Sequence, residues 1–184
     1  MDMKLKGLLE EKKSTILSGW FNVIIETYPA DNTGFLKKQK NRFANPVGHT
    51  FSQGLEGILE ALIEEKGLAV ALPFLEDIIK VRAVQNFTPS KALGFIFTLK
   101  KVVREELKTE IRQDQIDNEL MSFESRIDDL ALSAFDIYMK CGEQLNQLKF
   151  DELKRMTFTL LKKANLMYEI PMEESEQKDL EPTI

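Results

Sequence analysis

Residues 116–141 read IDNELMSFESRIDDLALSAFDIYMKC, and this stretch decides the fold class. Its apolar positions lie alternately four and three residues apart with no proline or glycine between them, and they are Ile116, Leu120, Phe123, Ile127, Leu130, Ala134, Ile137 and Cys141. Such spacing places all eight side chains on one face of an α-helix. We therefore predict a long helix with an apolar seam. The seam packs inside a helical bundle in one interpretation and between two copies of the chain in the other, because both arrangements use the same spacing.

The rest of the chain also has the composition of a helical protein. Of its 184 residues 43% are hydrophobic, and glycine (9) and proline (6) are scarce. Apolar residues at helical spacing, with Pro29 as a stop signal and Thr50 and Thr88-Pro89 as start signals, predict helices near 4–28, 50–66, 73–87, 89–107 and 151–167. We expect an all-α, single-domain bundle of about six helices.

The net charge of −5 is concentrated at the C-terminal end. Residues 169–184 hold six acids and one base, so residues 1–168 are neutral as a group (−5 minus −5). The polar, acidic composition predicts a helical domain over 1–168 followed by a disordered tail over 169–184. A neutral body does not favour nucleic-acid binding, and the one small basic run, residues 37–42, lacks the aromatic residues that stack on single-stranded bases. Without an apolar run of ~20 residues or a signal peptide, we expect a cytoplasmic protein with no membrane insertion.

The chain offers little chemistry for catalysis, because it has one histidine, His49, and one cysteine, Cys141. Cys141 falls on the apolar seam, where a buried thiol is typical, and the pair cannot complete a zinc or di-iron site. His49 precedes Thr50, a predicted helix cap, so we expect it to face solvent rather than to bind haem. We predict a protein that is not an enzyme and holds no metal or cofactor. The alternative is a small-molecule or haem-binding sensor with a pocket in the bundle.

Arg82 lies in a segment, residues 78–87, that is apolar on more than one side. An arginine in such a place reaches the rim of the core or pairs with a buried acid such as Glu105 or Glu106. Recognition of a ligand or a partner is the other interpretation.

Several short motifs resemble a known family. They are LEEKK (9–13) with Trp20 and Tyr28-Pro29, FANPVG (43–48), VRAVQNFTPS (81–90) and VREEL (103–107). Together, over about residues 5–145, they resemble the N-terminal domain of RsbT co-antagonist proteins of the RsbRD type. The motifs contain six residues to which the resemblance gives no role, and these are Asn45, Pro46, Gly48, Arg82, Phe87 and Arg104.

The resemblance implies an all-helical input domain, related to globin-like sensors without haem, that forms homodimers and tunes a bacterial stress-signalling assembly. Co-antagonists of this kind carry a C-terminal STAS domain that meets the kinase and bears phosphorylatable threonines. The chain has only an acidic segment after its helical body, so kinase binding and phospho-switching are not carried over. We expect a stand-alone regulatory sensor or adaptor that binds a signalling protein.

Overall fold

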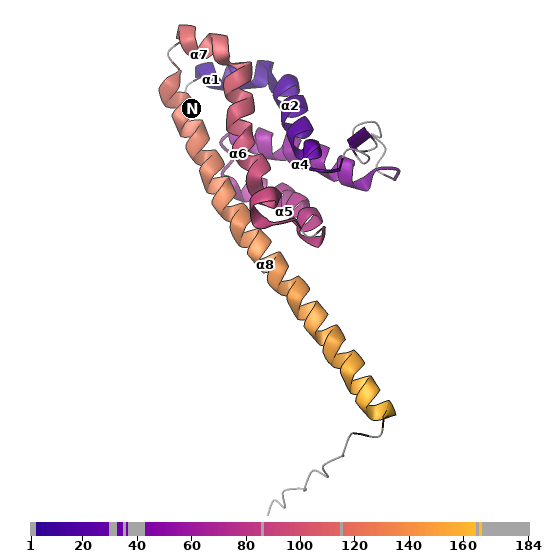
Figure 1. The fold of residues 1–184 in the computed structure, drawn as a ribbon. Helices are drawn as coiled ribbons and strands as arrows, with labels where there is room; N and C mark the ends of the chain where they lie inside the picture. Colours follow the sequence, from indigo (N-terminus) through magenta and orange to yellow (C-terminus); the bar gives the residue numbers. More distant parts are fainter. Residues whose placement is uncertain are drawn as a thin grey trace, which may run out of the picture. The chain divides into compact units, whose positions relative to one another are not determined.

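The computed structural model describes residues 3–29, 33–34, 36, 43–85, 87–114, 116–164 and 166, and its regular structure is helical throughout. The helices are α1 (Met3–Glu11), α2 (Lys13–Glu26), α4 (Pro46–Ile63), α5 (Leu68–Val84), α6 (Pro89–Glu106), α7 (Lys108–Asp114) and α8 (Asp117–Lys163) (Figure 1). The predicted all-α helical bundle is confirmed. The chain divides into two units, residues 1–145 and 146–184, and the bundle belongs to the first. The predicted acidic tail, 169–184, lies outside the described residues.

Two predicted helix boundaries near the ends of the chain were wrong. The stretch 4–28 forms two helices, because a turn at Lys12 separates α1 from α2. Conversely, the seam helix and the helix predicted at 151–167 are one continuous helix, α8. Residues 143–150 are mostly Glu, Gln, Leu and Lys, which favour helix, and the single Gly142 weakens a helix by only about 1 kcal/mol.

Two predicted helix starts were also wrong. α4 begins at Pro46, and its cap is Asn45 rather than Thr50, which lies inside the helix. α5 begins at Leu68, directly after Gly67, so Pro73 is its sixth residue rather than part of its first turn. The backbone φ of 82° at Gly67 reverses the chain between α4 and α5. Only glycine adopts this conformation without strain, which explains why the turn occurs at this position.

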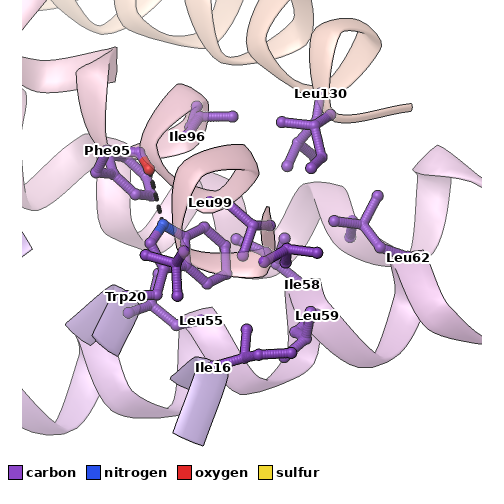
Figure 2. Packing of buried hydrophobic residues seen from close by; sticks show 14 of the residues in the cluster. Ile16, Trp20, Leu55, Ile58, Leu59, Leu62, Phe95, Ile96, Leu99 and Leu130 are labelled. Atoms are coloured by element: carbon purple, nitrogen blue, oxygen red, sulfur yellow. Dashed lines mark hydrogen bonds between the residues drawn. The ribbon is translucent and has the colours of Figure 1, made fainter. Parts of the chain in front are cut away.

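The core of the first unit joins helices that are far apart in the sequence. Trp20 of α2 is fully buried, and its Nε1 donates a hydrogen bond to the Phe95 carbonyl oxygen of α6 at 2.7 Å (Figure 2). Gly57 allows α4 to pack closely on α5, since a Cβ at this position would lie only 2.6 Å from the ring of Phe74. Leu130 points from α8 into the same apolar cluster (Figure 2). The bundle is therefore held by packing among α2, α4, α5, α6 and α8.

The seam residues lie against this core. Ile137 is half-buried and the other seven are buried, namely Ile116, Leu120, Phe123, Ile127, Leu130, Ala134 and Cys141. Their burial inside a single chain supports the bundle interpretation of the seam.

Candidate functional site

Arg82 carries the most unusual environment in the bundle, because its side chain is fully buried. Its Nη2 donates to the Lys91 carbonyl oxygen at 2.7 Å and to Thr27 Oγ1 at 3.1 Å. The guanidinium carbon lies 4.4 Å from the ring centre of Phe87, with the rings of Tyr28 and Phe95 at 5.7 and 5.8 Å. Aromatic faces attract cations, so these three rings provide part of the stabilisation that a carboxylate would otherwise give.

The expectation that Arg82 reaches the rim or pairs with Glu105 or Glu106 was therefore wrong. Among the described residues, Arg82 Nε and Nη1 have no hydrogen-bond partner. Burial lowers the pKa of Arg82 from its usual value, and burial also raises the pKa of Tyr28, against the opposing effect of the neighbouring cation. The guanidinium remains charged at neutral pH, because arginine does not lose its proton in proteins.

The turn between α5 and α6 connects Arg82 to other parts of the bundle. The ring centre of Phe87 lies 5.2 Å from that of Tyr28, which is 6.0 Å from Phe51 of α4. Tyr138 of α8 donates a hydrogen bond to the Phe87 carbonyl oxygen. No sequence pattern had singled out Tyr138, although its position four residues after Ala134 and three before Cys141 was a signal that it would approach the core.

The motif around Asn45 builds the start of α4. Asn45 Oδ1 accepts a hydrogen bond from the Gly48 amide at 2.8 Å, and its Nδ2 donates to the Leu36 carbonyl oxygen at 2.9 Å. Pro46 occupies the first helical position, which needs no amide donor. A Cβ at Gly48 would lie 2.2 Å from Asn45 Nδ2, so the cap needs glycine there. We infer that these three residues are structural.

Arg104 lies apart from both motifs on the exposed side of α6. Its Nη2 donates to Glu124 Oε2 of α8 at 2.7 Å, and its Nε bonds the other carboxylate oxygen. This two-point geometry orients both side chains, although an exposed pair of this kind adds at most about 1 kcal/mol. The six motif residues are therefore spread over separate places in the bundle: a helix start, a buried cation and a surface ion pair.

His49 and Cys141 lie on different helices of the first unit. His49 is half-buried within α4 and borders a polar cavity of about 440 Å³, with Phe74, Glu56, Glu60 and Asp77. The expectation that His49 precedes a helix cap was wrong, because α4 begins three residues earlier. Cys141 is 9% exposed on α8. The part of the chain that the structure describes contains no group of three or more His, Cys, Asp or Glu placed to hold a metal ion.

α8 exposes large apolar side chains in both units. In the first unit Leu132, Phe135 and Met139 are 69%, 48% and 44% exposed. In the second unit every described residue is exposed, and the large apolar ones are Leu148, Phe150, Leu153, Met156, Phe158, Leu160, Leu161 and Leu166. No helix in the described ranges has the length and the apolar character that crossing a membrane requires.

A second cavity, of about 470 Å³, lies entirely within the first unit. Its inner wall comes from the end of α4 and the start of α5, where Leu62 and Ala71 are buried and Leu68 is half-buried. The facing wall is α8, through Arg126, Asp129, Leu132 and Ser133. No sequence pattern had indicated this cavity, since its two walls lie far apart in the chain.

Comparison with known proteins gives one match. The family model described as the RsbT co-antagonist protein RsbRD N-terminal domain matches residues 14–151, which is well over half of the chain. All six motif residues lie within the matched range, as do both cavities. No curated protein and no solved structure matches the chain.

Proposed function

Because the chain belongs to the family of RsbT co-antagonist RsbRD N-terminal domains, a family of signalling proteins, we propose that it is a non-catalytic regulatory domain that acts through protein contacts. The observation that carries this proposal is the exposed apolar surface of α8. We place the domain in the bacterial cytoplasm, where it tunes a stress-signalling assembly. Its first partner is a second copy of itself.

The helical residues 146–163 supply the physical reason for a partner. Phe150, Leu153, Met156, Leu160 and Leu161 fall on one side of the helix, and all five are exposed. A helix in a protein takes most of its stability from packing its apolar face, and large exposed apolar patches mark interaction sites. A cover over this face would remove that apolar surface from water.

The spacing of the exposed residues favours another helix with the same period. Leu132, Phe135 and Met139 follow three-and-four spacing, and so do Leu153, Met156 and Leu160. Met139 and Leu153 are 14 residues apart, which is two heptads, so both sets occupy equivalent heptad positions. A symmetric dimer brings such a surface against its own copy. Asn146 and Lys149 fall on the same heptad row, where polar residues fix the register of paired helices.

The test is the oligomeric state of the full chain, measured by sedimentation velocity across a wide range of protein concentrations. We expect a reversible dimer that the double variant Leu153→Glu, Leu160→Glu converts to monomer, because it places charges on the proposed contact. Leu148→Glu is the matched control, since Leu148 lies about 140° around the helix from Leu153. We expect this control to remain dimeric. A wild-type chain that is monomeric at every concentration, or a control that dissociates as readily, would contradict the proposal.

A second candidate function is a sensor that binds a small molecule, and the 470 Å³ cavity is the observation that favours it. The haem version has less support, because His49 borders a cavity lined with carboxylates, whereas haem ligands project into apolar pockets. Absorbance of the freshly purified protein in the Soret region tests the haem version directly. A stoichiometric haem band that disappears in His49→Ala would reverse this preference.

A further inference from the structure

The 470 Å³ cavity is a recess with a buried apolar floor. Leu62 and Ala71 at its base are 5% and 1% exposed, whereas Leu132 at its mouth is 69% exposed. The volume falls within the range of ~300–1,000 Å³ that is usual for small-molecule sites. A recess of this size and depth fits a small molecule better than the side of another helix.

The charged residues at the mouth indicate which ligands the cavity would accept. Arg126 of α8 donates a hydrogen bond to Glu65, the second residue after α4, and its guanidinium lies 5.6 Å from the ring of Phe123. The backbone φ of Glu65 is 52°, a value that residues other than glycine seldom adopt. This uncommon backbone conformation therefore lies next to the ion pair, at the wall of the cavity. Glu65 is thus already paired, and Asp129 supplies the second carboxylate of the mouth.

Asp129 is the carboxylate that α8 contributes to the mouth. It lies three residues after Arg126 and four before Ser133, so helical geometry places all three side chains on the same side of α8. Its backbone carbonyl oxygen accepts a hydrogen bond from Ser133 Oγ at 3.1 Å. Among the described residues, the Asp129 carboxylate forms no ion pair. A cation at the mouth would find this carboxylate available, whereas an anion would meet repulsion from Asp129.

We propose that this cavity is a binding site for a small organic amine, with its apolar body against Leu62, Leu68 and Leu132 and its ammonium group beside Asp129. Leu132 also belongs to the exposed row on α8, so a bound amine alters one of the side chains available for association. Ligand binding and self-association are then coupled, and each changes the other by the same factor. This coupling rests on the proposed function, whereas the binding itself does not.

The test uses two compounds with the same apolar body and opposite charge, tryptamine and indole-3-acetate. Each is titrated into the full-length, ¹⁵N-labelled chain, and amide shifts are followed by NMR. We expect tryptamine to shift the amides of residues 61–71 and 126–133, with an affinity about tenfold higher than that of indole-3-acetate. Equal affinities, or shifts confined to residues 146–163, would overturn the proposal. The second outcome would show that the compounds bind only the exposed apolar face of α8.

Two variants, with one control, identify the groups that bind the ligand. Asp129→Asn should remove the preference for the amine, and Asp136→Asn, an exposed position on α8 that does not border the cavity, should keep it. Ser133→Phe should fill the cavity from its outer side and abolish binding of both compounds while circular dichroism and melting remain as in the wild type. Sedimentation of the same samples reports association separately. Loss of the preference in Asp136→Asn, or unchanged binding in Ser133→Phe, would place the site elsewhere.

Discussion

Two stretches of α8 have similar sequences and opposite surroundings. Residues 117–141 and residues 146–163 both carry apolar side chains at three-and-four spacing. In the first stretch Ile127 and Leu130 are fully buried, whereas in the second Leu153 and Leu160 are 59% and 66% exposed. Periodicity therefore predicts a helix with an apolar face, but it does not predict what covers that face.

The contacts that surround each stretch explain the difference. The first stretch is joined to the bundle by ion pairs from Lys100 to Asp128 and from Arg104 to Glu124, in addition to the apolar seam. The hydrogen bonds found within the second stretch link residues three or four positions apart, such as Arg155 with Glu152. Local contacts of this kind contribute only ~0.2–0.5 kcal/mol each, so the second stretch needs another source of stability.

Ile127→Asn, in the buried first stretch, should lower the free energy of unfolding the most. It places an amide in a fully buried apolar layer and should lower the free energy of unfolding by about 2–4 kcal/mol. The loss should be the same at every protein concentration, because the seam packs within one chain. Chemical denaturation at several concentrations measures it.

Leu153→Asn is the matched change in the second stretch. In the monomer it should alter stability by no more than about 0.5 kcal/mol, because the side chain is already exposed. In a dimer its effect should grow with protein concentration. Equal losses of stability in both variants, independent of protein concentration, would show that the two stretches are buried in the same way, which would contradict the difference described above.

Tyr138→Phe should have an intermediate effect. The variant leaves the Phe87 carbonyl oxygen, which is part-buried, without the hydroxyl donor from α8. We expect a loss of about 1 kcal/mol in the free energy of unfolding. Tyr28→Phe removes an exposed hydroxyl bond to Gln85 and should cost less. If Tyr28→Phe lowers the free energy of unfolding as much as Tyr138→Phe does, the hydrogen bond between α8 and the α5–α6 turn stabilises the fold no more than an exposed hydroxyl bond does.

Gly142→Ala should have a small effect, and it should be stabilising. Gly142 lies inside α8 between the two stretches, and a Cβ there would meet no atom within 4 Å. Alanine should raise the free energy of unfolding by about 0.5–1 kcal/mol, because glycine loses more backbone entropy in a helix. Slower hydrogen exchange at residues 143–150 would locate the gain. A loss of stability would mean that this position needs glycine for a contact.

The helical fold could be predicted well from the sequence, whereas the sites could be predicted only in part. Proline, glycine and threonine signals found the approximate places of most helices, because capping and backbone geometry act over a few residues. They gave the wrong cap for α4, since Thr50 and Asn45 are both good cap residues and only the bond to Gly48 distinguishes them. The rings around Arg82 come from the segment after α2 (Tyr28), from the turn at Phe87 and from α6 (Phe95), so no local pattern reveals them.

Local patterns in the sequence were enough to predict that the chain is helical, that one face of α8 is apolar, and that the motifs of the RsbRD family are present. These properties depend on residues that lie within a few turns of one another. The packing of the helices, which is seen only in the structure, places the seam against its own bundle and buries Arg82 among rings, with no carboxylate of the described residues bonded to it. It also placed Glu65 and Leu62 opposite Asp129 to enclose a cavity. Such arrangements depend on how separate helices pack, and packing is set by the combined shape of many side chains rather than by any one segment.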